Sequence, residues 1–457
     1  MKHKKILYIF LINIIFIELS FSYIIYPFKT RKIQIENENN NLTLLLRSII
    51  DNHIFINLEM AEPKQIIEVF LRTDFEEFYF SEKIKCDINT NSPNPLIYDV
   101  NSSIINFYNI NKSFSIEITN KSISNYKAGR HEGNFSSDYL YFKSNKDEIK
   151  KRISFILYNT TVWNMPGIIG LQFPKFLDNK NYYFIEQLKY NDIINSYFWM
   201  INYTSNYEGN LIIGEQPNII YHNYYKDYEL KIAHTFLYSN REWGLRFNKF
   251  LFDDKIMEND YNCLFSYENN YIMGNEKLEK ELDIYFNEYI TNNICFKEYI
   301  IYPYIPRIFF YCNKDKYYEK MKYFPNLEFY HNELNYTFEL NYKDLFIEKY
   351  DKLILMIFFD EIKMSFSLGK PFLRKYSFLF NQDTKLIGYY IKKEKNKSDN
   401  NNNGVILKLI VIILLLIILF ILGIIIGKYL IKKKKKPLNI IDEDYNYEYI
   451  NKNNYQL

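Results

Sequence analysis

Residues 54–80 read IFINLEMAEPKQIIEVFLRTDFEEFYF, and this stretch points most directly to the structural class of the chain. Apolar and polar side chains alternate over Ile56–Met60, which is the period of a strand with one buried face. Residues 61–65 contain a proline and follow that strand as a turn. Because residues 66–71 are again largely apolar and β-branched, the stretch predicts a β-hairpin that ends at residue 71.

Short apolar runs of the same kind recur along the chain, separated by Asn, Asp, Lys or Pro, a texture typical of all-β folds. Residues 139–142 and 153–158 are the clearest further strands. Phe184, Ile185 and Leu188 instead follow helical spacing, so one short helix is expected there. The sequence therefore predicts a mostly β structure.

Length and composition leave room for a large packed core. The chain has 457 residues, of which 48% are hydrophobic and 19% aromatic, whereas glycine occurs only 13 times. Two or three domains are expected at roughly 150 residues each. Residues 23–404 hold 46 basic and 49 acidic side chains, so most of the chain is nearly neutral and no nucleic-acid partner is expected.

The N-terminus has the pattern of a secretory signal peptide. A basic start at residues 2–5 precedes the apolar run Ile6–Ile17, and Ser20 and Ser22 follow at the small-residue spacing of a cleavage site. Cleavage after Ser22 would remove residues 1–22. The alternative is that the segment remains as an uncleaved signal anchor.

A second apolar run predicts one transmembrane helix over residues 405–427. Its stretch Leu409–Gly427 carries no charged side chain and is long enough to cross a hydrocarbon core of about 30 Å. The five lysines at 432–436 place the tail, residues 428–457, in the cytoplasm. Residues 393–404, rich in Lys, Asn and Ser, form the stalk before the membrane. A single-pass type I membrane protein is expected, at the cell surface or in an endolysosomal or vacuolar membrane.

Two short patterns near the C-terminus have a functional and an ordinary explanation. Gly423 and Gly427 form a GxxxG pair that can join two membrane helices, although glycine is common in such helices. Tyr447 and Ile450 form a Tyr-x-x-apolar pattern similar to endocytic or lysosomal sorting signals. A chain this rich in Tyr and Ile also contains such pairs by chance.

Glycosylation and cysteine signals agree with an extracytoplasmic location for most of the chain. Nine Asn-x-Ser/Thr sequons occur, at Asn41, Asn101, Asn111, Asn120, Asn134, Asn159, Asn202, Asn335 and Asn396. Four cysteines permit two disulfides in three pairings, and Cys295 with Cys312 is the first expected pair because they lie close in sequence. The pairing of Cys86 and Cys263 stays open, since Cys263 lies in an apolar run and can equally be a buried thiol.

Several segments, taken in order, resemble the pepsin-like aspartic peptidases. Residues 163–174 read WNMPGIIGLQFP, and a helix-like segment and the strand-like GNLIIGEQP follow. Residues 367–390 read SLGKPFLRKYSFLFNQDTKLIGYY, which is similar to the end of that family's second lobe. Residues 243–245 resemble the opening of the second lobe, and residues 54–80 resemble the opening of the first. The resemblance covers about residues 50–392 and depends on the order of these segments.

This resemblance implies a bilobal pepsin-like acid protease fold, with lobes over residues 23–205 and 206–392. In that family each lobe supplies one aspartate on an Asp-Thr-Gly or Asp-Ser-Gly loop. The two carboxylates share one proton and activate a water molecule that attacks the peptide carbonyl. Glycine belongs at the third position of each loop because the backbone turns sharply there.

The resemblance also implies a flap hairpin and a disulfide. Tyr126 and Gly129 match the flap, in which the tyrosine would close over bound peptide, although the chain is rich in tyrosine. Cys295 and Cys312 fall where the family has its second-lobe disulfide.

Neither catalytic aspartate is present where the resemblance places it. Arg72 stands at the first aspartate position and Ser266 at the second, and no Asp-Thr-Gly or Asp-Ser-Gly occurs in the chain. A guanidinium and a hydroxyl cannot share an acidic proton or deprotonate water. Asp74 and Glu268 stand at the two glycine positions and are candidates for a displaced carboxylate pair.

No cofactor and no metal ion are expected. Six histidines are scattered without metal-ligand spacing, and the chain contains no HExxH, phosphate-binding loop or nucleophile elbow. Trp163, Trp199 and Trp243 are expected in the core rather than as ligand platforms.

The sequence therefore predicts a membrane-anchored, catalytically inactive homologue of aspartic peptidases. Its partner would be an extended peptide or a protein, held between the lobes by strand-like hydrogen bonds. If Arg72 faces the cleft floor, it would favour an acidic group on that partner. The first alternative is an active acid endopeptidase that uses Asp74 and Glu268. The second is a surface or sorting receptor with a peptidase-like scaffold and its signal in the tail.

Overall fold

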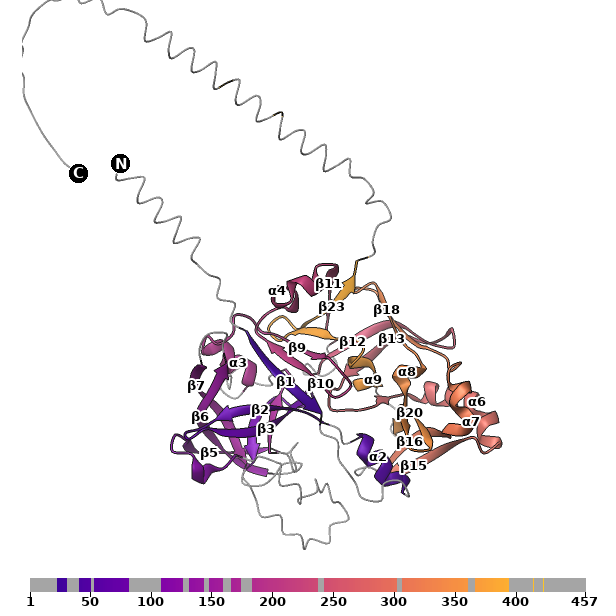
Figure 1. The fold of residues 1–457 in the computed structure, drawn as a ribbon, viewed down its shortest axis with the longest axis horizontal. Helices are drawn as coiled ribbons and strands as arrows, with labels where there is room; N and C mark the ends of the chain where they lie inside the picture. Colours follow the sequence, from indigo (N-terminus) through magenta and orange to yellow (C-terminus); the bar gives the residue numbers. More distant parts are fainter. Residues whose placement is uncertain are drawn as a thin grey trace, which may run out of the picture. The chain divides into compact units, whose positions relative to one another are not determined.

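In the computed structural model, strands predominate over helices, as the sequence predicts (Figure 1). The structure describes residues 23–30, 41–50, 53–81, 108–125, 131–143, 148–158, 166–173, 183–236, 242–301, 306–360, 366–393, 414 and 422. Residues 1–392 form one compact unit and residues 393–457 form another. The fold described below is that of the first unit.

The first half of this unit, residues 23–213, is built around a closed six-stranded barrel. The strands of this half are β1 (Ile24–Thr30), β2 (Ile54–Met60), β3 (Gln65–Arg72), β4 (Phe78–Ser81), β5 (Glu117–Asn125), β6 (His131–Lys143), β7 (Glu148–Tyr158), β8 (Gly167–Gly170), β9 (Phe198–Tyr203) and β10 (Glu208–Ile213). Its helices are α2 (Leu42–Ile50), η2 (Ile110–Lys112) and α3 (Phe184–Tyr190). The barrel runs β2-β3-β8-β4-β7-β6, and β6 closes it by pairing back to β2.

The second half, residues 214–392, holds a ten-stranded sheet and most of the helices. The strands of this half are β11 (Tyr228–His234), β12 (Gly244–Phe252), β13 (Lys255–Phe265), β14 (Ile272–Met273), β15 (Cys295–Ile301), β16 (Pro306–Asn313), β17 (Leu327–His331), β18 (Tyr336–Leu340), β19 (Phe346–Lys349), β20 (Lys352–Asp360), β21 (Phe366–Leu368), β22 (Phe378–Asn381) and β23 (Leu386–Lys392). Its helices are α4 (Pro217–Ile220), α5 (His222–Tyr225), α6 (Glu276–Thr291), α7 (Lys314–Met321), α8 (Tyr342–Leu345) and α9 (Lys370–Leu373). The sheet order is β15-β16-β20-β14-β21-β13-β12-β17-β18, with β19 paired to β20.

One sheet segment joins the two halves. It runs β11-β23-β22-β9-β10-β1, so that three strands come from each half. The junction is the antiparallel pair β9–β22, in which Leu379 lies opposite Met200 and Phe380 opposite Trp199. β10 pairs with β1 and β9, which both belong to the first half. By strand pairing the first half therefore extends to residue 213, beyond the expected boundary between residues 205 and 206.

The two halves repeat one local arrangement, in which a hairpin strand ends beside a short parallel strand. In the first half β3 runs parallel to β8, and in the second half β13 runs parallel to β21. β8 ends at Gly170 and Gly369 directly follows β21, and another backbone segment crosses each of these glycines closely. A Cβ atom would lie 2.5 Å from the backbone of Glu76 at Gly170 and 2.1 Å from the carbonyl oxygen of Tyr271 at Gly369. Glycine is therefore required at both positions.

Aromatic side chains fill the core where the halves meet. Trp199 and Trp243 are fully buried, and Trp199 stacks on Phe380 with ring centroids 4.1 Å apart. The Nε1–H group of Trp243 donates to the carbonyl oxygen of Leu171 across the halves at 2.7 Å. The expectation that these tryptophans are core residues is confirmed, and Trp163 lies outside the described residues.

The predicted local elements agree with the structure. The hairpin expected up to residue 71 is β2–β3, and the two further predicted strands lie within β6 and β7. The helix predicted from Phe184 is α3. Cys295 and Cys312 lie opposite each other in β15–β16 and form a disulfide. Cys263 is a buried thiol, whereas Cys86 lies outside the described residues.

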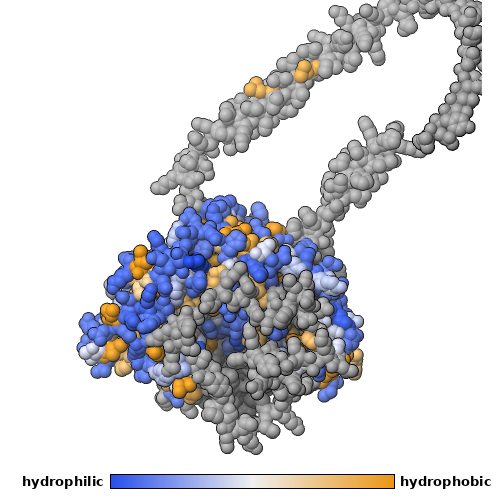
Figure 2. Space-filling model, turned by 180° about the vertical axis from the view of Figure 1, so that it is seen from behind, coloured by the Kyte–Doolittle hydropathy of each residue, from blue (hydrophilic) through white to orange (hydrophobic). Residues whose placement is uncertain are grey.

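Most of the predicted sequence features near the termini lie outside the described part of the chain. These are the signal peptide 1–22, the GxxxG and sorting patterns, the tail, nearly all of the stalk, and all of residues 405–427 except Leu414 and Leu422. Among the described residues, no helix is both long and apolar enough to cross a membrane. The face seen in Figure 2 is mostly hydrophilic where it is coloured, with scattered hydrophobic residues.

The predicted glycosylation sites fall into three groups. Asn41, Asn111 and Asn335 are exposed, and Asn134 and Asn202 are half-buried. The structure does not describe the side-chain exposure of Asn120. Residues 101, 159 and 396 lie outside the described residues.

Candidate functional site

The candidate site lies where two turns, one from each half, touch. The first turn follows β3 and begins at Arg72, and the second follows β13 and begins at Ser266. Thr73 joins them, because its Oγ1 lies 3.3 Å from the carbonyl oxygen of Phe265 and accepts from the backbone N–H of Tyr267 at 3.4 Å. The two positions that correspond to catalytic aspartates in the resemblance therefore belong to turns in direct contact.

Arg72 is held by a carboxylate from its own turn. Its Nε donates to Oδ1 of Asp74 at 2.7 Å and its Nη2 to Oδ2 at 2.5 Å, a bidentate pair. The Arg72 side chain is 11% exposed and that of Asp74 37%. Burial lowers the pKa of Arg72, but the Asp74 carboxylate and then Glu268 outweigh this and raise it, so the guanidinium stays charged.

Glu268 crosses from the second turn to the first. Its Oε1 accepts from the Ser266 hydroxyl at 2.6 Å. Its Oε2 lies 2.8 Å from Oγ1 of Thr73 and accepts from the Thr73 backbone N–H at 3.3 Å. Burial raises the pKa of Glu268, the negative charge of Asp74 adds to the rise, and Arg72 and these hydrogen bonds oppose it.

Two basic side chains that the sequence analysis did not assign lie near the turns. His53 comes just before β2, and burial followed by the charges of Arg72 and Lys370 lowers its pKa to about 3. Lys370 begins α9, and burial followed by the charge of Arg374 lowers its pKa to about 7, while Glu268 opposes the shift. The sequence signal for Lys370 was a lysine directly after the glycine of an apolar segment. His53 carried no signal of this kind.

The arrangement does not favour a shared acidic proton. Both oxygens of Asp74 accept from Arg72, and the Ser266 hydroxyl donates to Glu268. A dyad of the peptidase type needs two carboxylates that face one water molecule. Here a guanidinium and two hydroxyls contact the carboxylates, so the polar groups satisfy one another across the turns.

The β5–β6 hairpin is present where the flap is expected, with Asn125 opposite His131. Tyr126 and Gly129 lie in the connection between the two strands, outside the described residues. The flap and its two matched residues stay a prediction.

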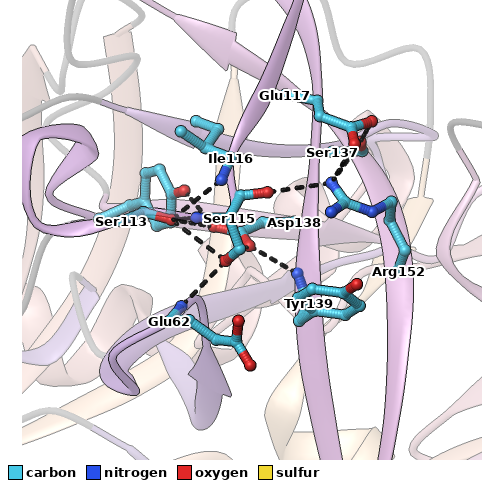
Figure 3. A network of polar contacts seen from close by, with 10 residues as sticks. Glu62, Ser113, Ser115, Ile116, Glu117, Ser137, Asp138, Tyr139 and Arg152 are labelled. Carbon is cyan, nitrogen blue, oxygen red and sulfur yellow. Dashed lines mark hydrogen bonds and ion pairs between the residues drawn. The ribbon is translucent and has the colours of Figure 1, made fainter.

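A buried carboxylate fixes the base of this hairpin (Figure 3). Asp138 of β6 is fully buried and accepts from the hydroxyls of Tyr108 at 2.6 Å, Ser113 at 2.7 Å and Ser115 at 2.5 Å. The Nη1 of Arg152 donates to the Ser115 carbonyl oxygen at 3.0 Å. These contacts attach residues 108–115 to β6 and β7 and satisfy the buried charge.

No group of three or more His, Cys, Asp or Glu side chains within the described ranges is arranged to hold a metal ion. No family model matches the chain, and no curated protein matches it.

Proposed function

We propose that this chain is a membrane-anchored, pepsin-like aspartic peptidase homologue without a catalytic pair, which binds polypeptide between its two halves. One observation carries the proposal. The two turns meet through Thr73, yet they hold the Arg72–Asp74 ion pair and the Glu268–Ser266 hydrogen bond where two aspartates would share a proton.

Three features of the described residues support the pepsin-like part of the proposal. The halves repeat the arrangement of a hairpin strand beside a short parallel strand, with a closely crossed glycine at the end of that strand or directly after it. They share a six-stranded sheet segment with three strands from each. Their two turns touch at the positions that the sequence resemblance assigns to the catalytic loops.

The binding part of the proposal follows from keeping such a scaffold without its chemistry. A polypeptide held beside a hairpin edge gains strand-like backbone hydrogen bonds, which do not need a catalytic carboxylate. The β5–β6 hairpin would cover the bound chain. Because Asp74 neutralises Arg72, we do not assign an acidic ligand group to Arg72.

A peptidase assay tests the loss of chemistry. Full-length protein in detergent micelles is incubated at acidic pH with a peptide mixture, with and without a transition-state-type inhibitor of aspartic peptidases, and products are identified by mass spectrometry. We expect no inhibitor-sensitive cleavage. Cleavage that disappears in Asp74→Asn but persists in Asp383→Asn, an exposed control, would establish the displaced carboxylate pair instead.

A capture assay tests the binding function. Immobilised full-length protein is exposed to the same mixture at neutral pH, and we expect a subset of peptides to be retained. If none is retained, the scaffold does not bind free polypeptide. Deleting residues 445–457 then tests the receptor alternative, because a sorting signal in the tail predicts that the protein changes compartment.

A further inference from the structure

Helix α2 belongs to the first half by sequence and packs on the second half. It lies between β1 and β2, yet in Figure 1 it stands beside β15 and β16, away from its neighbours in the chain. Leu45, Leu46, Ile49 and Ile50 of α2 are all buried. They form one apolar cluster with residues of the second half, namely Tyr271, Met273, Ile300, Phe309, Met356 and Phe358.

The four aliphatic residues explain why α2 is helical at this place. They are spaced at i, i+1, i+4 and i+5, so a helix puts them on one side. Asn41 caps the start, its Oδ1 accepting from the backbone N–H of Leu44 at 3.2 Å. A helix of nine residues is not stable alone in water, so the apolar face of the second half must stabilise it.

The C-terminal end of α2 reaches the candidate site. Asn270, two residues after Glu268, donates from Nδ2 to the carbonyl oxygen of Ile50. His53 lies three residues after Ile50, and burial followed by the charges of Arg72 and Lys370 lowers its pKa. The same segment of the first half therefore contacts both the apolar face and the surroundings of the two turns.

We propose that this face of the second half is a docking surface for a short amphipathic helix, and that α2 is its tethered occupant. The face lies on β14, β15, β16 and β20 beside the second turn. This inference goes beyond the proposed function and adds a second partner, a polypeptide helix with aliphatic residues at the spacing of α2. Such a partner binds when it displaces α2.

The contacts of α2 set what a competing helix must supply. Aliphatic side chains fill the cluster, and a free carbonyl at the helix end accepts from Asn270, as Ile50 does. A hydroxyl two residues before the last helical residue contacts Lys349, whose Nζ donates to Oγ of Ser48 at 3.3 Å. The tether favours α2 over a free helix, because a linked segment acts at an effective concentration of about millimolar.

The test uses full-length protein and a fluorescent peptide with the sequence of residues 41–50, NLTLLLRSII. In the wild type the face is occupied, and we expect little binding by fluorescence anisotropy. In Leu46→Glu the charged side chain expels α2, and we expect at least a tenfold gain in affinity for the peptide. Ile284→Glu is the matched control, since Ile284 is 69% exposed on α6 and its substitution leaves α2 in place. A peptide with glutamate at the position of Leu46 should not bind.

Two results would overturn the proposal. The first is a Leu46→Glu protein that unfolds as cooperatively as the wild type and binds the peptide no better. The second, which needs no variant, comes from hydrogen exchange of the wild type: amides of α2 that exchange as slowly as those of β20 mean that α2 does not open separately.

The outcomes separate this inference from the proposed function. If Leu46→Glu binds the 41–50 peptide while neither protein retains any member of the peptide mixture, the docking surface stands and the general polypeptide function fails. If the wild type retains members of the peptide mixture while Leu46→Glu binds the 41–50 peptide no better than the wild type does, the function stands and the docking surface is wrong.

Discussion

Arg72 illustrates how a position can lose its chemistry and keep its place in the fold. The sequence predicts that an arginine there cannot act as an acid, and it places Asp74 on the same face of the extended chain. The bidentate pair between them was therefore within reach of sequence reasoning. The contact of Glu268 with Thr73 was not, because it depends on two turns from distant parts of the chain meeting.

The ion pair of Arg72 gives the first prediction. Asp74→Asn removes the charge that compensates the nearly buried guanidinium, so the free energy of unfolding should fall by about 1–3 kcal/mol. Urea denaturation of the full-length protein measures this. Asp254→Asn is the control: Asp254 is exposed with φ of 58°, a conformation that asparagine adopts as readily. An Asp74→Asn protein as stable as this control would contradict the proposed role.

Glu268 gives a prediction about pH. Because burial raises its pKa above the ordinary value of 4.5, the folded protein keeps this proton at pH values where the unfolded chain has lost it. Its contribution to stability is therefore present below pH 4.5 and is lost as the pH rises through the folded pKa. Glutamine does not titrate, so the stability of Glu268→Gln relative to the wild type should increase from acid towards neutral pH.

Urea denaturation at a series of pH values checks this difference. Glu298→Gln, at a half-buried position on β15, controls for the loss of one negative charge. Comparing variants is necessary because the lowered pKa of His53 gives the wild type a slope of opposite sign, with stability rising between about pH 3 and 6.5. A stability difference for Glu268→Gln that is flat, or falls with pH, would show that burial does not dominate at Glu268.

At the scale of elements, the sequence predicts what is local. Period-two alternation correctly predicts β2–β3, and helical spacing correctly predicts α3. The nearness of Cys295 and Cys312 correctly predicts their disulfide, because both lie at the ends of one hairpin. The position of α2 was not predictable in this way, since an amphipathic pattern shows that a face is buried and does not identify its partner.

The network around Asp138 gives the prediction at this scale. Asp138→Asn removes a buried charge that three hydroxyls and the N–H of Tyr139 contact, so we expect a loss of about 2–3 kcal/mol in unfolding free energy. Asp383→Asn, at an exposed turn, is the control and should change little. Hydrogen exchange should increase most in β5 and β6, whose base the network fixes. Faster exchange elsewhere, with β5 and β6 unchanged, would refute this assignment.

For the whole molecule, the shared sheet segment decides how the halves behave together. Sequence order alone suggests two independent lobes, and strand pairing shows that three strands of the second half extend the sheet of the first. The order of six strands from both ends of the compact unit is set by non-local pairing. Local periodicity carries no information about it, which is why the sequence could not give it.

The shared segment predicts one cooperative unfolding transition for residues 23–392. Thermal denaturation followed by tryptophan fluorescence and by far-ultraviolet circular dichroism should give coincident curves. Phe380→Ala, which removes the ring stacked on Trp199, should lower stability by about 3–5 kcal/mol without splitting the transition. Two separated transitions in the wild type would mean that the halves are independent domains.

The β9–β22 junction also has a consequence for biosynthesis. β9 ends at Tyr203, and its partner β22 begins only at Phe378. A ribosome adds the residues between them at about 5–20 per second. The edge of β9 that pairs with β22 therefore remains unpaired for roughly 10–35 s. During that time an open strand edge is a template for pairing with another nascent copy. The newly made chain is therefore exposed to such pairing until its last strands emerge.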